Sequence, residues 1–287
     1  MTCRFAGWLL VLCGWSAGAH ADECPPALVK PDAPVPGLVV VSLDDTGMAF
    51  TTCGMADIPR KRAVSRDTLF QAASLTKPVT ALIALTLVEE GKLDLDRPLV
   101  GYLDGPYRHD QALLGGQPVW DTVEDPRLRK VTARLVLSHR SGLPNWAFGE
   151  PLRFALDPGT EWKYSGEGFS LLAAVLEHIS GQTLPALAAE RVFTPLDMRD
   201  SGLVWRDDYA DRMATGYDTQ GKVIDAMQFR RPVAAASLYT TPADYVRFVQ
   251  AMLRAKPGSA SARLRERQVE VDASYALGWG LGLGLEE

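Results

Sequence analysis

The sequence predicts an α+β protein, because strand-like segments lie near both chain ends and helix-like segments lie between them. Residues 37–43 form an apolar run rich in β-branched side chains, and residues 48–54 form a second run after the turn sequence 44–47. Two such runs around a short turn predict an antiparallel hairpin. Near the other end, glycine and leucine alternate, and we predict one strand over residues 275–285.

Between these strands the sequence predicts a series of helices. The first covers residues 75–90 and is followed by Gly91 as a C-cap. The later helices expected are 133–138 after the N-cap Thr132, 167–180 before Gly181, 183–193, and one that begins after Thr241 and ends near Leu253. Residues 263–271 are polar and show no helix or strand pattern.

Residues 1–21 are expected to be a signal peptide rather than part of the fold. They combine a positively charged start, a short apolar core over 5–15 and a small-x-small cleavage site at 19–21. We therefore expect cleavage after Ala21 and a periplasmic or secreted protein. Residues 14–18 fit the nucleophile elbow of α/β-hydrolases, but they lie within this segment and cannot act in the mature chain.

The four cysteines divide into two pairs by position. Cys3 and Cys13 leave with the signal peptide, whereas Cys24 and Cys53 remain, an even pair in an oxidising compartment. Two alternatives stay open for them: a disulfide that ties the mature N-terminus to the second predicted strand, or two separate thiols.

Composition excludes several function classes. The chain has 287 residues, of which 47% are hydrophobic and 23% charged, with a formal net charge of -5. There is no basic stripe for nucleic acid, and no segment after the signal peptide is apolar for long enough to span a membrane. No cluster has metal-ligand spacing and no phosphate-binding glycine loop follows a strand, so we expect no metal and no cofactor. The expected partner is a small-molecule or peptide substrate, and the oligomeric state stays open.

Ser74 and Lys77 are candidate catalytic residues, because they lie three positions apart at the start of the predicted helix 75–90. Residues at this spacing share a helix face, so the hydroxyl and the amine can meet. A serine needs a base to become a nucleophile, and a lysine in a partly dry site can lose its charge and be that base. The helix start also favours negative charge that develops near Ser74. A solvated pair on a helix surface is the alternative, because Ser-x-x-Lys is common by chance.

Tyr164 is the third candidate catalytic residue. It follows the turn sequence 157–160 and precedes a helix, where its phenol can point into a cleft and move protons when a nearby ammonium lowers its pKa. A core tyrosine with a satisfied hydroxyl is the alternative. His139 is expected to be structural and to shape a tight turn beside the site. Trp146 and Trp162 flank these loops, either as core packing or as walls of a substrate cleft.

Five stretches carry a combined signal that none of them carries alone. They are Thr68-Leu-Phe-Gln-Ala-Ala-Ser74-Leu-Thr-Lys77-Pro, Leu137-Ser-His139-Arg-Ser-Gly142-Leu, Pro158-Gly-Thr-Glu-Trp-Lys-Tyr164-Ser, Ala235-Ala-Ser-Leu-Tyr-Thr-Thr-Pro-Ala-Asp244 and Leu277-Gly-Trp-Gly280. Together, and in this order, they resemble the serine β-lactamase and penicillin-binding-protein-like superfamily. The class C-like branch, which includes esterases, is the nearest.

The resemblance implies a fold and a division of the chain. The fold is an antiparallel sheet flanked by helices, built from both chain ends, with an all-helical lobe inserted between them. After the signal peptide at 1–21, residues 22–91 and 237–287 would form the α/β lobe and residues 92–236 the helical lobe.

The resemblance also implies catalytic roles. Ser74 would be the nucleophile, with its backbone N–H as one oxyanion donor, and Lys77 the base. Tyr164 would relay a proton to the leaving group and help to activate the deacylating water. We therefore expect a secreted serine hydrolase with an acyl-serine mechanism on a carboxylic ester, a β-lactam or a cell-wall peptide. The alternative is a non-catalytic or truncated member of the fold that binds cell-wall peptide. A structural secreted module fits less well, because the three catalytic candidates occur in order with matching flanks.

Two departures from the family pattern bear on substrate and activity. The second motif is usually Tyr-x-Asn, but the third position here is Gly166, which offers no amide to a substrate and favours esters over β-lactams. The family also places a Lys-Thr-Gly or His-x-Gly motif on a strand after Gly280, whereas the last lysine is Lys256 and the last histidine is His178. The 287 residues alone are therefore expected to lack C-terminal sheet strands and one oxyanion donor, and to be inactive and poorly soluble.

Overall fold

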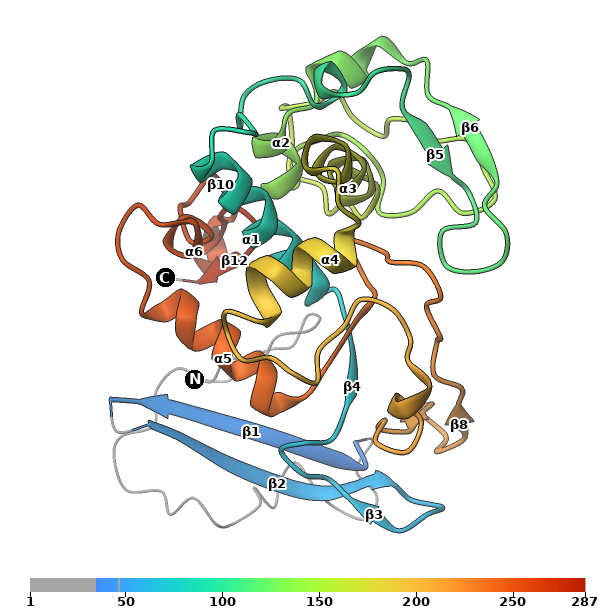
Figure 1. Cartoon of the computed structure of the whole chain (residues 1–287), viewed down its shortest axis with the longest axis vertical. Coiled ribbons are helices and arrows are strands. Elements are labelled where there is room, and N and C mark those ends of the chain that lie inside the picture. The colour runs from blue at the N-terminus through green and yellow to red at the C-terminus, as the bar shows by residue number, and fades with distance from the viewer. Residues whose placement is uncertain (1–34, 46, 287) are drawn as a thin grey trace.

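The structure is a computed structural model that describes residues 35–45 and 47–286 (Figure 1). The expected signal peptide at 1–21 and the cysteine Cys24 lie outside these residues. Within the described ranges, no helix combines the length and the apolar character that a membrane crossing needs.

The N-terminal hairpin consists of β1 (Gly37–Asp44) and β2 (Gly47–Asp57), which pair antiparallel. The Asp44 carboxylate stabilises the turn by accepting a hydrogen bond from the Gly47 N–H at 3.0 Å. A short strand, β3 (Arg62–Ala63), extends the sheet beyond β2. The predicted hairpin is confirmed.

The helix α1 (Thr76–Glu89) runs through the centre of the molecule. Almost every side chain from Thr76 to Leu87 is buried, as expected for a helix that is apolar around its circumference. The chain enters it from β4 (Phe70–Ala73), which pairs with β9 (Leu238–Thr240). Gly91 follows with a φ of 69°, so the predicted helix and its glycine stop are confirmed.

The segment between α1 and β9 holds short helices and two small hairpins. Its helical elements are η1 (Leu99–Tyr102), η2 (Pro126–Lys130), α2 (Ala133–Leu137), α3 (Glu167–Ser180), α4 (Leu184–Ala188), the π-helical η3 (Ala189–Phe193) and η4 (Asp207–Tyr209). The hairpins are β5 (Arg108–Asp110) with β6 (Trp120–Thr122), and β7 (Gly216–Tyr217) with β8 (Val223–Ile224). The expected helices are present, with 183–193 divided into α4 and η3. The two hairpins correct the prediction of an all-helical lobe. They were not predicted because strands this short leave no period-2 pattern in the sequence.

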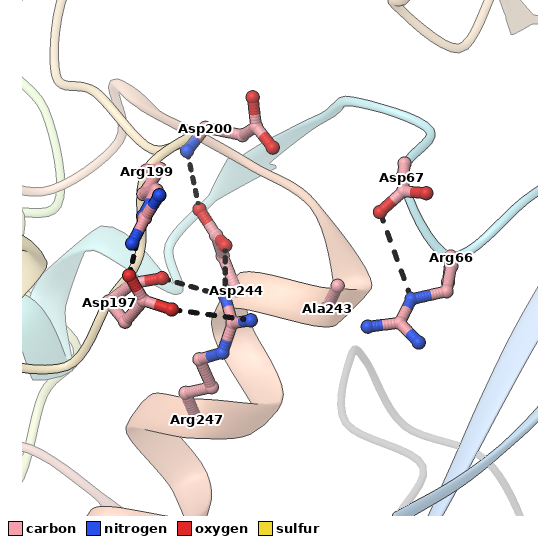
Figure 2. A pocket seen from close by; sticks show the side chains of 8 residues that line it. All are labelled: Arg66, Asp67, Asp197, Arg199, Asp200, Ala243, Asp244 and Arg247. Atoms are coloured by element: carbon pink, nitrogen blue, oxygen red, sulfur yellow. Dashed lines mark hydrogen bonds and ion pairs between the residues drawn. The ribbon is translucent and has the colours of Figure 1, made fainter.

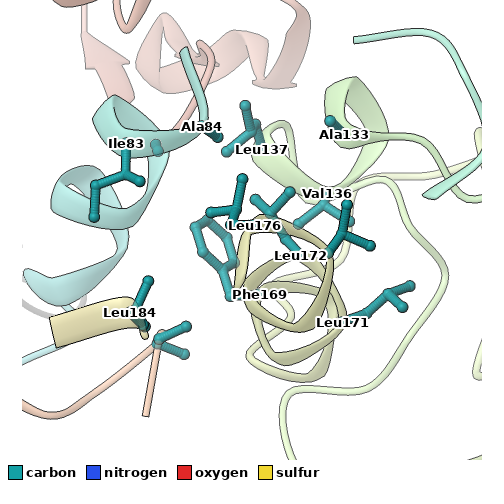
Figure 3. Packing of buried hydrophobic residues seen from close by; sticks show 14 of the residues in the cluster. Ile83, Ala84, Ala133, Val136, Leu137, Phe169, Leu171, Leu172, Leu176 and Leu184 are labelled. Carbon is teal, nitrogen blue, oxygen red and sulfur yellow. The ribbon is translucent and has the colours of Figure 1, made fainter. Parts of the chain in front are cut away.

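The main hydrophobic core lies where α1, α2, α3 and α4 meet. Figure 3 shows Phe169 and Leu176 of α3 between α1 and α2, with Leu184 of α4 beside them. All three side chains are at most 1% exposed. Fully burying such a side chain is worth about 1.5–3 kcal/mol relative to leaving it in water, so this packing fixes the position of α1.

The C-terminal part begins with α5 (Pro242–Leu253), which the Thr241 side chain caps by accepting from the Asp244 N–H, as predicted. Two short elements come next that were not predicted, α6 (Ala260–Arg263) and β10 (Val269–Asp272). The polar composition of this stretch hides its short elements.

The single strand predicted over 275–285 is wrong. This stretch contains the end of η5 (Ala273–Tyr275), then β11 (Leu277–Trp279), a turn, and β12 (Gly284–Glu286), which pairs back onto β11. The Gly280 N–H closes the turn on the Leu283 carbonyl at 2.8 Å. Gly282 has a φ of 112°, and a Cβ on it would lie 2.4 Å from the Ala81 side chain of α1. The alternating glycines therefore serve a tight turn against α1.

The strands of the two chain ends form two sheets in the described residues, one of β1, β2 and β3 and one of β10, β11 and β12. The helix α5 packs against both β1 and α6, and Figure 1 shows α5 between β1 and β12. The sheet that the resemblance builds from both chain ends is thus present here as two separate three-stranded parts.

Candidate active site

Ser74 lies in the turn that joins β4 to α1. The preceding residue, Ala73, has a φ of 44°, a left-handed conformation that is costly for any residue with a Cβ. The Lys77 N–H donates to the Ser74 carbonyl at 3.1 Å and begins the helix. The Ser74 side chain is exposed while Lys77 is only 2% exposed. A substrate can therefore reach the hydroxyl, and the amine lies beneath it.

The Lys77 amine donates hydrogen bonds to Ser74, which was predicted, and to a backbone carbonyl that was not predicted. Its Nζ donates to the Ser74 hydroxyl oxygen at 3.1 Å and to the Ala235 carbonyl at 2.9 Å. Aromatic rings surround it, with the Tyr164 ring centre at 4.5 Å and the Trp146 ring centre at 5.9 Å. Within the described residues no carboxylate forms an ion pair with Lys77. The predicted meeting of the Ser74 and Lys77 side chains is confirmed.

Burial lowers the pKa of Lys77 to about 7. An ammonium in an apolar pocket loses its hydration, and one carbonyl and one hydroxyl replace only part of it. The amine is therefore neutral in a large fraction of molecules near pH 7. A neutral amine at hydrogen-bond distance from Ser74 can take the hydroxyl proton.

The segment that supplies the Ala235 carbonyl is fixed to α1 by further hydrogen bonds. The Thr80 hydroxyl donates to the Ala234 carbonyl at 2.8 Å, and the Leu238 N–H donates to the Thr76 hydroxyl at 2.8 Å. The hydrogen bond from Lys77 to the Ala235 carbonyl thus joins residues more than 150 positions apart in sequence. Sequence reasoning did not assign Ala235 because a carbonyl acceptor leaves no side-chain signal.

Tyr164 lies over the Lys77 amine and is half-buried. Burial raises the pKa of the Tyr164 phenol, and hydrogen bonding with Ser74 only partly opposes this. The expectation that an ammonium lowers this pKa is therefore wrong, since the loss of hydration outweighs the hydrogen bond with Ser74. At neutral pH the phenol keeps its proton and can give it to a neighbouring anion.

His139 holds the backbone on both sides of Tyr164. Its carbonyl accepts from the Lys163 N–H at 2.8 Å, and its Nδ1 accepts from the Ser165 N–H at 3.0 Å. The ring lies 4.3 Å from the Tyr164 ring, centre to centre. Burial and then the nearby Lys77 charge lower the pKa of His139 to about 3. The imidazole is therefore neutral with its proton on Nε2, and it shapes the turn as expected.

Two tryptophans complete the aromatic surroundings of His139. The Trp279 ring centre lies 4.8 Å from that of His139 and 5.5 Å from that of Trp162. Trp162 is thus a packing residue behind Tyr164, one of the two roles left open for it. Trp146, for which the same two roles were left open, lies beside the Lys77 amine instead.

A buried ionic cluster behind the site was missed by sequence reasoning. The His109 Nδ1 lies 2.8 Å from the Asp121 carboxylate, and its Nε2 lies 3.4 Å from the Glu167 carboxylate in an ion pair without hydrogen-bond alignment. Glu167 is fully buried, and its other oxygen accepts from the Ala147 N–H at 2.9 Å. The only sequence signal was an acidic residue in the first turn of α3, which is usually a solvated cap.

A separate hollow of about 320 Å³ near the start of α5 is lined by charged side chains that pair with one another (Figure 2). Asp244 is 2% exposed and accepts hydrogen bonds from the Asp200 N–H at 2.8 Å and from Arg247 at 2.9 Å. Arg247 also pairs with Asp197. These contacts anchor the 197–200 turn on α5, and none of the three catalytic candidates lies among the lining residues.

The fold and the facing Ser74 and Lys77 side chains define a candidate serine hydrolase. A family model described as Beta-lactamase matches residues 27–286. The chain belongs to this family of serine hydrolases.

The relatives include enzymes of more than one kind. The chain is 33% identical to Esterase EstB of Burkholderia gladioli over 182 residues, which are 53% of this chain and 42% of that protein. It is 25% identical to the Beta-lactamase of Escherichia coli K12 over 230 residues, 77% of this chain and 57% of that protein. The chain thus spans about half the length of these relatives. The family match places the chain among relatives named as hydrolases, and these names differ in the type of hydrolase.

Solved structures agree with the fold. The structure of EstCE1, titled a hydrolase with promiscuous acyltransferase activity, superposes with a TM-score of 0.70 at 22% identity and covers 88% of this chain and 78% of its own. The predicted mixed helix-and-sheet fold of the β-lactamase type is confirmed.

Proposed function

We propose that this protein is an exported serine hydrolase that cleaves carboxylic esters through an acyl-serine intermediate. The observation that carries the proposal is the 3.1 Å contact between the Ser74 hydroxyl and a buried Lys77 amine whose pKa is lowered to about 7. The family and its esterase relatives support it.

In the acylation step, the Ser74 oxygen attacks the ester carbonyl carbon while its proton passes to Lys77. The carbonyl π electrons move to oxygen, and the negative charge that results develops near the start of α1, where free N–H groups and the helix dipole stabilise it. The base is neutral before the step and cationic after it, and it stays in contact with the Ala235 carbonyl. A general base of this kind contributes about 10²–10⁴ to the rate.

In the second half of the step, the carbon–oxygen bond to the alcohol breaks and the leaving alkoxide needs a proton. The Tyr164 phenol is protonated at neutral pH and lies beside both Lys77 and Ser74. It gives its proton to the alkoxide and recovers one from Lys77. Water then attacks the acyl-serine with the proton path reversed.

Carboxylic esters are favoured over β-lactams because Gly166 carries no side-chain amide. A substrate amide that enters the site would leave a polar group unpaired, at a cost of about 1–3 kcal/mol. Specificity constants for a chromogenic cephalosporin and a short-chain nitrophenyl ester measure this directly. A clear preference for the cephalosporin would contradict the ester assignment.

Export to the periplasm or medium is part of the proposal and rests on residues 1–21. A second observation supports it, because Cys53 is disulfide-bonded and buried, and disulfides persist in oxidising compartments. The other three cysteines lie outside the described residues, so the Cys24–Cys53 pairing stays a prediction. Cell fractionation and intact-mass analysis of the exported protein test both points.

The experiment that tests the function is covalent labelling with a fluorophosphonate, which reacts with activated serines. It uses the protein at its natural full length. We expect labelling of the wild type and of the control Ser42→Ala, whose exposed hydroxyl lies on β1, and none of Ser74→Ala. A folded wild type that takes up no label would instead favour the non-catalytic alternative, and binding of a cell-wall peptide would then be measured.

A further inference from the structure

The position after Tyr164-Ser165 is a glycine because the Asn145 backbone and the Trp146 ring fill the space there. A Cβ built on Gly166 would lie 2.6 Å from the Asn145 carbonyl oxygen and 2.9 Å from two atoms of the Trp146 indole. The backbone angle does not demand glycine, since φ is -87°. The requirement is the close approach of the Asn145 carbonyl and the Trp146 ring. The Gly166 N–H donates to the same Asn145 carbonyl at 3.0 Å.

The Trp146 ring extends from this position to the catalytic amine and outward to solvent. Its centre lies 5.9 Å from the Lys77 Nζ on one side. On the other side it stacks on Phe148, with ring centres 5.1 Å apart and planes 20° from parallel. Phe148 is 41% exposed. Two stacked rings therefore form an apolar surface, the aromatic wall, that begins beside the base and ends in water.

The loop that carries the aromatic wall is held in place by hydrogen bonds to residues outside the loop. The Ala147 N–H, between the two rings, donates to the buried Glu167 carboxylate at 2.9 Å, and the Gly149 N–H donates to the Gln111 carbonyl at 3.0 Å. A surface that is already fixed binds a flat partner without a large loss of conformational entropy.

We propose that the aromatic wall of Trp146 and Phe148 is a substrate subsite for a flat, apolar group of the ester. Offset stacking on an aromatic face is favourable beyond the area that it buries, and the Phe148 ring offers no hydrogen bond to a polar substrate group. The inference rests on the proposed esterase activity and adds the class of ester. The flat group is carried either on the acyl side or on the alcohol side of the scissile bond.

The test compares three esters in a pH-stat assay: ethyl phenylacetate, with the ring on the acyl side; benzyl acetate, with the ring on the alcohol side; and ethyl acetate as the reference. Each is measured with the wild type, Trp146→Leu and Phe148→Leu. We expect both substitutions to lower kcat/KM for one of the aromatic esters about tenfold more than for ethyl acetate, the scale of a lost aromatic contact. The ester that responds identifies the side that carries the ring.

Controls separate this loss from misfolding. Trp120→Leu removes an exposed tryptophan of β6, whose ring lies under the Arg108 guanidinium, and it should leave the ratio between esters unchanged. Phe148 is exposed enough for its variant to keep the fold, so a failure of Trp146→Leu to fold leaves the test intact. Labelling of Ser74 together with an equal effect of Phe148→Leu on all three esters would overturn the aromatic wall as a subsite and leave the proposed function standing. Loss of Ser74 labelling would point instead to failure of the function itself.

Discussion

The Lys77 amine lies 4.5 Å above the centre of the Tyr164 ring, and hydrogen bonds from the amine join this pair to Ser74 and to the Ala235 carbonyl. The amine is thus enclosed by oxygens that accept hydrogen bonds from it and by aromatic rings, none of which carries a full negative charge. Such an enclosure lowers the pKa of an amine without trapping it in an ion pair. It distinguishes a lysine placed as a base from a lysine placed to neutralise a carboxylate.

Replacing Lys77 tests its role as the base. Lys77→Ala should lower the rate of Ser74 acylation by about 10²–10⁴, the usual contribution of a general base. Lys77→Arg should be nearly as slow, because a guanidinium stays protonated and cannot accept the proton. The measurement is the rate of fluorophosphonate labelling by quenched-flow and mass spectrometry. Retention of most of the activity in Lys77→Arg would exclude a base at this position.

Replacing Tyr164 tests the proton path to the leaving group. Tyr164→Phe removes the phenolic hydroxyl and keeps the ring that packs on His139, so the melting temperature should be preserved. The acylation rate, measured as kcat/KM, should fall by about 10²-fold or more for an alkyl ester, whereas it should fall much less for a nitrophenyl ester, whose anion leaves without a proton. Equal losses on the two esters would show that Tyr164 does not protonate the leaving group.

Much of this site follows from sequence, and the parts that do not have identifiable causes. The helix that presents Ser74 and Lys77 was predictable because it is long, apolar and closed by Gly91. The pairing of β4 with β9 was not, because each strand is short and the pairing depends on a partner far along the chain. Ala235 contributes only a carbonyl, and no residue preference marks such a role.

Gly166 and the C-terminal residues show a second kind of limit. Gly166 stood out in the sequence as a missing amide, but only the structure shows Trp146 in that space. The alternation of glycine and leucine after Trp279 has the period of a strand, yet the glycines allow a tight turn against α1. A period-2 pattern carries no information when its small residues are needed for close approach.

A methyl group at position 166 should be poorly tolerated. Gly166→Ala forces the new Cβ to within 2.6 Å of a backbone oxygen and 2.9 Å of the Trp146 ring, and overpacking of this kind costs about 1–3 kcal/mol. The control is Gly105→Ala, where nothing lies within 4 Å of the new Cβ and the change should be neutral or slightly stabilising. Urea unfolding measures both, and equal stability of the two variants would mean that the Asn145 carbonyl and the Trp146 ring do not hold the positions described.

The His109 cluster should make stability depend on pH. Burial alone would lower the pKa of His109, but the Glu167 and Asp121 carboxylates outweigh it and raise that pKa above its usual value. Folding is therefore stabilised by a protonated His109 below about pH 6.5, and this contribution is lost as the pH rises through the raised value. His109→Gln should cost most stability at about pH 5 and least at about pH 9.

The matched control for this prediction is His178→Gln. His178 lies 3.6 Å from Asp104 with its side chain 37% exposed, and exposed pairs contribute about 0–1 kcal/mol at most. Urea unfolding at a series of pH values measures both variants. A difference between wild type and His109→Gln that does not change with pH would show that His109 stays neutral between its two carboxylates.

The pH dependence of Ser74 labelling tests most directly whether a buried, neutral Lys77 activates this serine. Because the pKa of Lys77 is lowered to about 7, the wild-type labelling rate should rise with pH, reach half its limit near pH 7 and then level off. Lys77→Arg should show no such rise. A wild-type rate that is flat from about pH 5 to about pH 9, or that rises only near the ordinary lysine pKa of about 10.4, would contradict the assignment of Lys77 as the base.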